Sequence, residues 1–398
     1  MHDSDGNRGL CPRISFAMTP TPSPPMPSAS AAGRPFVVRA LILALMLGLL
    51  ATEWSLRSYT SYGASVEHKA DSDLGWRLQT ADLAYGDSGI ALRINSHGFR
   101  DQEWLPPGPG EGDVFRIAVL GDSVTFGAGV KESDRWTDLL QGAICAETGQ
   151  RDVVVMNLGL PGYTLEQMAQ CYEHVVRPYK PDLVLLALND ISARPASVLE
   201  PEHGSALAQA VRGTAVYDFW QRSISVGAHA TGRRYSSRER AEHRRVKAIW
   251  EEPFAPAHEL MWRRFIRRTA ELADAVRSDG SQLVLIPLPA FVHCRQPEGP
   301  RLAARLADWE PIHELPRIDS FSGVLKVMSP LLKHVEELGL DPDMVWSNGA
   351  GLEDPLDPHW ADQSLFFLHD RRHLTSTGHA LVAEEIQAGL RKLGFIGA

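Results

Sequence analysis

From residue 115 onward, short uninterrupted apolar runs alternate with stretches in which the apolar residues keep helical spacing. The runs fall at Ile117–Leu120, Val153–Met156, Leu183–Leu188 and Leu283–Ile286. Such runs, without polar interruption, are typical of strands buried on both faces. The stretches between them predict helices over about 136–144, 165–176 and 260–276. Because strands that alternate with helices form parallel sheets, the pattern predicts an α/β fold.

The C-terminal part continues this order. We expect a helix over about 321–338, a fifth parallel strand near Met344, and a closing helix over 375–393. The segment 192–257 interrupts the pattern and is longer than an ordinary loop, which predicts an inserted cap or a flexible lid. Its many Arg and Lys residues predict either a solvated helix face or a surface that rests on anionic lipid headgroups.

The N-terminal part has a different composition. Residues 1–33 are rich in Pro, Ser, Thr and Ala, which predicts a disordered tail. Residues 34–54 are almost wholly apolar, which predicts a transmembrane signal anchor; a cleaved signal peptide and a buried core helix are the alternatives. Arg34 and Arg39 flank one side of this segment, so the N-terminus is expected in the cytoplasm and the rest of the chain outside it, as a single-pass membrane protein.

Between this segment and the first predicted strand of the sheet, residues 55–113 show strand-like alternation punctuated by Gly. The segments Asp73–Leu78 and Leu92–Asp101 carry most of this pattern. We expect a small accessory β extension that packs against the main domain, residues 114–398. In the alternative interpretation, His97 and Arg100 reach the mouth of a functional site.

Charge and cysteine content narrow the function classes. The formal net charge of −9 disfavours nucleic acid as a general partner, because phosphate binding needs a concentrated positive face. The four cysteines lack metal-ligand spacing, and Cys145 and Cys171 are expected either as two buried residues or as a disulfide in an oxidising compartment. No phosphate loop, dinucleotide fingerprint or metal motif is present in the sequence, so no cofactor is expected.

Phe115–Gly129 is the stretch with the clearest chemical potential. The apolar strand ends at Gly121, and Ser123 follows at the carboxyl end of the strand, where open α/β sheets bind their ligands. Asp and Ser are also ordinary turn and cap residues, so this stretch alone equally fits a structural turn. Three further blocks follow in chain order: Asn157–Gly162, Ala187–Asp190 and Asp370–His373.

Together these four blocks resemble the SGNH (GDSL-type) serine hydrolase superfamily, over roughly residues 116–393. The resemblance implies a flavodoxin-like three-layer sandwich around the five-stranded parallel sheet. It also implies catalysis by Ser123 as nucleophile, with His373 as its base and Asp370 to orient that base. His369 and His379 are nearby rivals for the base, and His379 is expected to cap or pack the closing helix.

Attack on an ester carbonyl produces an oxyanion, which needs donors already aimed at it. The resemblance implies three donors: the backbone N–H groups of Ser123 and Gly162, and the side-chain amide of Asn189. Gly162, rather than Gly159, matches the oxyanion glycine of the family. Asp190 is expected to fix the loop that presents Asn189.

The predicted function is therefore an exported, membrane-anchored serine esterase that cleaves carboxylic esters through an acyl-enzyme on Ser123. Its expected substrate is a small acyl ester, foremost an acetyl group on cell-envelope or extracellular carbohydrate. Two alternatives stay open: an O-acyltransferase that passes the acyl group to a sugar acceptor, and a catalytically idle carbohydrate-binding or assembly protein.

Overall fold

The computed structural model describes most of the chain in discrete stretches. The described residues are 34–59, 68–85, 90–108, 114–149, 153–189, 192–193, 214, 216, 256–295, 306, 312, 314–348, 364–367 and 373–397. The predicted tail at 1–33 lies outside them, as does nearly all of the predicted insertion at 192–257. Two compact units are distinguished, residues 1–51 and residues 52–398.

In the first unit, the described structure is helix α1, which spans Arg34–Tyr59 and continues past the boundary of the unit. Its stretch Val37–Ser55 has a mean hydropathy of 1.8 and none of it is buried. This length and composition suit a membrane span, and a signal sequence meets the same criteria.

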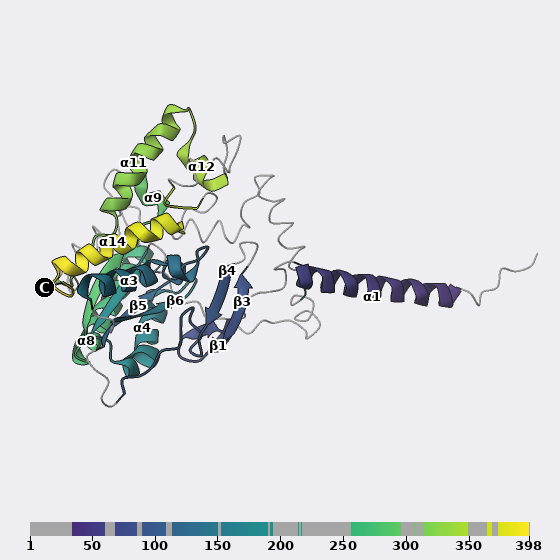
Figure 1. The fold of residues 1–398 in the computed structure, drawn as a ribbon, viewed down its shortest axis with the longest axis horizontal. Coiled ribbons are helices and arrows are strands. Elements are labelled where there is room, and N and C mark those ends of the chain that lie inside the picture. Colours follow the sequence, from purple (N-terminus) through teal and green to yellow (C-terminus); the bar gives the residue numbers. More distant parts are fainter. Residues whose placement is uncertain are drawn as a thin grey trace, which may run out of the picture. The chain divides into compact units, whose positions relative to one another are not determined.

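The second unit is built around a four-stranded parallel sheet in the order β6-β5-β7-β8, shown in teal to green in Figure 1. These strands are β5 (Phe115–Gly121), β6 (Val153–Gly159), β7 (Leu183–Leu188) and β8 (Gln282–Pro287). All four lie where the apolar runs predict them. At the carboxyl end of the sheet, Gly121 of β5 stands opposite Gly159 of the neighbouring strand β6.

Helices cover both faces of the sheet. They are α3 (Trp136–Thr148), α4 (Leu165–Cys171), α8 (Pro256–Ser278), α11 (Ser322–Glu337) and α14 (Ser376–Lys392). Alternate strand residues point to opposite faces, so Ile117 and Val119 pack under α3 and α14, whereas Ala118 and Leu120 pack under α4 and α8. The result is the three-layer sandwich that the sequence predicts.

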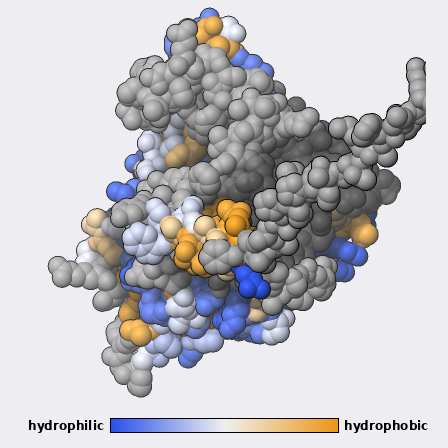
Figure 2. All heavy atoms as spheres, turned by 90° about the vertical axis from the view of Figure 1, so that its right-hand side faces the viewer, coloured by the Kyte–Doolittle hydropathy of each residue, from blue (hydrophilic) through white to orange (hydrophobic). Residues whose placement is uncertain are grey.

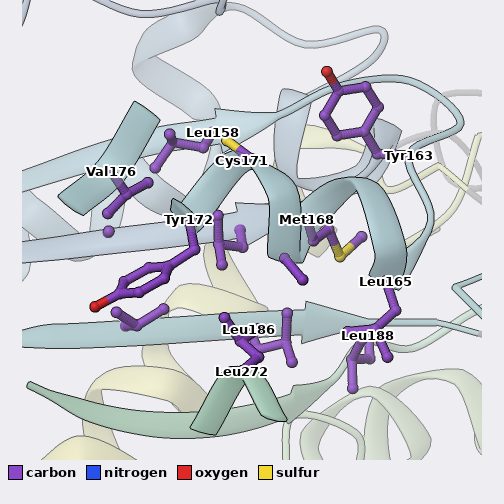
Figure 3. Close-up of a cluster of buried hydrophobic side chains, with 14 of the residues drawn as sticks. Leu158, Tyr163, Leu165, Met168, Cys171, Tyr172, Val176, Leu186, Leu188 and Leu272 are labelled. Atoms are coloured by element: carbon purple, nitrogen blue, oxygen red, sulfur yellow. The ribbon is translucent and has the colours of Figure 1, made fainter. Parts of the chain in front are cut away.

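The layer formed by α4 shows how one apolar helix face closes the sheet (Figure 3). Met168 and Cys171 of α4 lie between Leu158 of β6 and Leu186 of β7, and Leu272 comes from α8. Helix α4 continues through a five-residue π-helical turn, η2 (Tyr172–Val176), and a 3-10 turn, η3 (Arg177–Tyr179). Cys171 is fully buried, and Cys145 on α3 is partly buried. Both are free thiols, so they form no disulfide with each other.

The prediction of a fifth strand near Met344 is wrong. That segment is helix α12 (Pro342–Asn348), because Asp341 accepts a hydrogen bond from Asp343 N and Pro342 occupies the first helical position. In the part of the chain that the structure describes, the outer edge of β8 is met by a single parallel bridge between Leu285 and Arg317.

The predicted accessory extension consists of two antiparallel strand pairs. The first pair is β1 (His68–Asp71) with β2 (Gly75–Leu78), and the second is β3 (Ala81–Tyr85) with β4 (Ile90–Ile94). Hydrogen bonds from Tyr163 Oη to Trp76 O (2.5 Å) and from Gln167 Nε2 to Leu74 O (3.1 Å) attach the first pair to the helix α4 region. The extension therefore packs on the sheet domain, as expected.

Large apolar side chains exposed in the described residues are concentrated in α1, and the others are scattered singly, such as Leu105, Leu260 and Leu393. Figure 2 shows one face of the molecule, on which hydrophilic side chains predominate and a small group of apolar ones lies near the middle. Single exposed apolar residues are normal on protein surfaces.

Candidate active site

Ser123 is the first residue of a one-turn helix, α2 (Ser123–Phe126), directly after β5. Asp122 caps this helix, since its Oδ1 accepts a hydrogen bond from Val124 N at 3.0 Å. The turn needs two glycines: an added Cβ would lie 2.1 Å from Thr125 Oγ1 at Gly121 and 2.4 Å from Phe126 N at Gly159. The ends of β5 and β6 thus let α2 sit directly on the sheet and present Ser123 at its carboxyl edge.

His373 lies within hydrogen-bonding distance of this serine. Its Nε2 is 2.8 Å from Ser123 Oγ, across 250 residues of sequence, and both residues are partly exposed. The backbone holds His373 in place, because its carbonyl accepts a hydrogen bond from Phe367 N at 3.1 Å and a bridge joins Phe366 to Leu374. Geometrically, His373 can take the serine proton, which is the first requirement for a general base.

The loop after α2 also meets the segment that precedes His373. Gly129 has a φ of +89°, and an added Cβ there would lie 2.7 Å from the Phe367 ring. The loop that follows the serine and the segment that positions the histidine are therefore in direct contact.

His379, the rival that the structure describes, has a different environment. It is 1% exposed, and its Nδ1 accepts a hydrogen bond from Trp136 N at 3.2 Å. Burial, with the positive charge of Arg135 nearby, lowers the pKa of His379 to about 3, so the ring stays neutral at physiological pH. The expectation that His379 packs the closing helix is confirmed, because its buried ring joins α14 to the first N–H of α3. Thr375, not His379, caps α14.

Asn189 follows β7 and is 7% exposed. Its Nδ2 donates a hydrogen bond to Asp122 Oδ2, and its backbone N donates to Ser192 Oγ at 3.0 Å. The structure thus brings the Asn189 amide to the carboxylate that caps α2, next to Ser123. The Asn189 amide nitrogen carries two hydrogen atoms, and one of them forms the hydrogen bond to Asp122.

Gly162 lies in the turn between β6 and α4 with a φ of +83°, a conformation that favours glycine. An added Cβ would meet nothing within 4 Å, in contrast to the crowded Gly159. Gly159 therefore allows α2 to pack closely against β6. Gly162 has open space beside it, which a backbone N–H needs in order to contact a substrate.

Asp370, His369 and Asp190 lie outside the described residues. Within the described part of the chain, no three His, Cys, Asp or Glu side chains are grouped in a way that suits a metal ion. A hollow of about 480 Å³ lies between β4 and the 3-10 turn η1 (Glu132–Asp134), lined by Ile90, Ala91, Arg93, Lys131, Glu132 and Ser133. Ser123 and His373 do not line it, so it is not the reaction site.

Sequence reasoning missed the role of two buried charged residues, Arg100 and Asp101. The side chain of Arg100 bonds the carbonyls of Phe126, Gly127 and Val130, just after α2. The sequence offers no signal for these contacts, because the carbonyls that Arg100 bonds lie 26 to 30 residues away.

A serine and a histidine that meet at the carboxyl edge of a parallel sheet covered by helices on both faces are typical of α/β serine hydrolases. Residues 119–314 match the model of the GDSL-like Lipase/Acylhydrolase family. The chain thus contains a GDSL-like hydrolase domain. The described part of that domain has a parallel sheet in the order β6-β5-β7-β8. The match includes Ser123, Gly162 and Asn189 and ends before His373.

Several solved structures match much of the chain at low identity. A lipase/acylhydrolase from Enterococcus faecalis is 18% identical, covering 71% of this chain and 97% of its own, with a TM-score of 0.36. A catalytic mutant of the acetylxylan esterase Axe2 from Geobacillus stearothermophilus is 12% identical, covering 74% and 100%, with a TM-score of 0.37. A member of the lipolytic G-D-S-L family from Veillonella parvula DSM 2008 is 10% identical, covering 69% and 97%, with a TM-score of 0.34. No curated protein matches the chain.

Proposed function

We propose that the protein is a serine esterase that cleaves carboxylic esters through an acyl-enzyme on Ser123. The observation that carries the proposal is the 2.8 Å contact between His373 Nε2 and Ser123 Oγ at the edge of the sheet. In the first step, His373 takes the hydroxyl proton while Ser123 Oγ bonds the ester carbonyl carbon. The tetrahedral intermediate then collapses, and His373 returns the proton to the departing alcohol. Water, deprotonated by the same histidine, releases the acid and regenerates the serine.

The negative charge on the carbonyl oxygen needs donors during both steps. We assign this role to the N–H groups of Ser123 and Gly162 and to the side-chain amide of Asn189. The N–H of Ser123 is at the first position of α2, where no earlier helical carbonyl is available to it. Asp370 is proposed to orient His373 through Nδ1, as the spacing of the two residues allows.

For the substrate, we propose short acyl esters, foremost acetyl groups on carbohydrate outside the cytoplasm. The proposed location is supported by α1, whose apolar stretch precedes the whole hydrolase domain. We propose that α1 stays attached as a single-pass anchor, with the domain on the periplasmic or extracellular side.

A fluorophosphonate probe, which reacts with activated serines, tests the chemistry directly. The wild-type chain is expected to be labelled on Ser123, and the S123A and H373A variants are not. A wild-type chain that resists the probe and hydrolyses no aryl ester would refute the proposal and favour a binding protein with the same fold.

A panel of aryl esters of increasing chain length and acetylated sugars then defines the substrate. We expect the highest kcat/KM for acetyl esters. Adding an unacetylated sugar acceptor separates hydrolysis from acyl transfer, because an acyltransferase would produce acylated sugar in place of free acid.

A further inference from the structure

Two charged residues of the accessory segment before β5 are almost completely buried. Arg100 is 1% exposed and Asp101 is 5% exposed, although neither takes part in the proposed chemistry. A buried charge is costly unless hydrogen bonds or an opposite charge compensate it. The partners of these two side chains therefore show what the segment holds in place.

Arg100 bonds the end of the helix that starts with Ser123. Its guanidinium donates to the carbonyls of Phe126 (3.2 Å), Gly127 (2.7 Å) and Val130 (2.8 Å), and it lies 5.4 Å from the centre of the Phe126 ring. The last carbonyls of a helix have no partner within the helix, and a cation stabilises that end. In a helix of four residues, fixing its end also fixes Ser123 at its start.

Asp101 reaches the same helix by a second route. Its Oδ2 accepts a hydrogen bond from Asn157 N on β6 at 2.8 Å and another from Trp104 Nε1 at 2.8 Å. The side chain of Asn157 in turn donates to Thr125 O, within α2, at 2.7 Å. The Asp101 carboxylate is thus linked, through Asn157 of β6, to the middle of α2.

Arg135 anchors this pair of residues to the sheet domain. It is fully buried, donates a hydrogen bond to Arg100 O, and bonds Asp138 through Nε at 2.7 Å. Arg135 directly precedes Trp136, whose N–H is capped by His379. Through Arg135, the contacts of Arg100 therefore link the turn that carries Ser123 to α3 and to α14, the helix that follows His373.

We propose that Arg100 and Asp101 are positioning residues that hold α2 so that Ser123 stays within hydrogen-bonding distance of His373. This inference rests on the proposed role of Ser123 as nucleophile. It assigns the accessory segment a part in the reaction, through the geometry of the serine and without contact with substrate.

The test compares R100M, which keeps the apolar stem and removes the donors, with R100K and with the control Y179F. Tyr179 Oη bonds His97 Nε2 at 2.7 Å, so Y179F loosens the same segment at a point away from the nucleophile turn. The measurements are kcat and KM for an aryl ester, the rate of fluorophosphonate labelling, the Tm, and amide hydrogen exchange over residues 123–130.

We expect R100M to lower kcat and the labelling rate about 100-fold with KM nearly unchanged, because a displacement of about 1 Å at a reacting group costs this much. R100K should recover part of the loss, since its ammonium can still reach one or two carbonyls. Y179F should lower the Tm while kcat and labelling stay near wild type. Exchange over 123–130 should rise in R100M and not in Y179F.

Near-normal kcat in R100M, or equal loss in R100M and Y179F, would overturn the inference and leave the segment with a packing role alone. If the wild-type chain shows neither hydrolysis nor labelling, the proposed function fails, and hydrogen exchange decides the positioning role separately. Equal exchange over 123–130 in R100M and Y179F would then overturn it.

Discussion

His373, just before α14, and His379, in its first turn, have different environments, and we therefore expect different functions for them. His373 is partly exposed, and its Nε2 lies 2.8 Å from Ser123 Oγ. His379 is buried, and its Nδ1 accepts a hydrogen bond from Trp136 N. Burial opposes protonation of His379, and nothing in its geometry offers contact with a substrate. The two residues can therefore be separated by experiment.

H373A should abolish ester turnover and fluorophosphonate labelling, because Ser123 then lacks a base. H379A should retain turnover and lower the Tm, since the first N–H of α3 loses its acceptor at a cost of about 1 kcal/mol. Steady-state kinetics and thermal unfolding of both variants provide the check. Normal turnover in H373A would show that another residue is the base.

His379 also makes stability depend on pH. Its native pKa of about 3 is below the unfolded value of 6.5, so the unfolded state binds more protons between these two values. Stability is therefore fully present above pH 6.5 and falls as the pH drops below it. H379A should show a smaller loss of Tm between pH 7 and pH 5 than the wild type, measured by thermal unfolding in matched buffers.

Asn189 combines a structural bond with the proposed oxyanion role. Its bond to Asp122 predicts a lower Tm for N189A, and loss of the oxyanion donor predicts a kcat lower by roughly 100- to 1000-fold with little change in KM. Kinetics and thermal unfolding together separate the two effects. A kcat within a few-fold of wild type beside a lower Tm would assign Asn189 to the scaffold alone.

At the scale of elements, the position of the turn that carries Ser123 should respond differently to replacement of Gly159 and of Gly162. G159A places a Cβ 2.4 Å from Phe126 N and must push α2 off the sheet, whereas G162A meets open space and strains only its own backbone. We expect G159A to cost about 1–3 kcal/mol and most of the activity. G162A should cost about 1–2 kcal/mol, from its positive φ alone.

Circular dichroism melts and probe labelling of both glycine variants test this difference. Labelling of Ser123 in G162A should persist more than in G159A at temperatures where both are folded. Equal labelling in the two folded variants would show that α2 tolerates displacement from β6.

The elements show where sequence reasoning succeeds and where it fails. Strands β5 to β8 were predictable because strands buried on both faces must be continuously apolar. The segment at Met344 was mistaken for a strand because its apolar residues outweighed the helix-start signal of Asp341 and Pro342. The role of Arg100 was not predictable, since one arginine in a polar run does not reveal which carbonyls it bonds 26 to 30 residues away.

The sequence predicted which candidate residues lie close together, and the catalytic roles of Ser123, His373, Gly162 and Asn189 stay predictions. Ser123 and His373 do meet, and Asn189 does lie beside the cap of α2, because motif order in this fold determines which strand ends are neighbours. The structure also shows why glycine is needed at each of three positions: α2 packs closely on Gly121 and Gly159, and Gly162 has a positive φ. These reasons depend on packing and backbone conformation, which the sequence does not give. The role of Asp370 stays a prediction.

At the scale of the whole molecule, α1 and the hydrolase domain are distinct in composition. The span Val37–Ser55 is predominantly apolar and none of it is buried, and the GDSL-like match begins at residue 119. An exposed apolar helix of this length needs a nonpolar environment. We therefore expect the full chain to fractionate with membranes and to be released by detergent, not by high salt.

The orientation of the chain across that membrane follows from its basic residues. Arg34 and Arg39 lie at the N-terminal side of the apolar stretch, and basic residues favour the cytoplasmic side, so the hydrolase domain should lie outside the cytoplasm. A phosphatase that folds only outside the cytoplasm, fused after Ala398, should be active. A matched fusion with α1 deleted should be inactive. Activity of neither fusion would refute both the anchor and the export signal, and would place the esterase site inside the cell. Activity of the fusion that lacks α1 would show that export does not depend on α1.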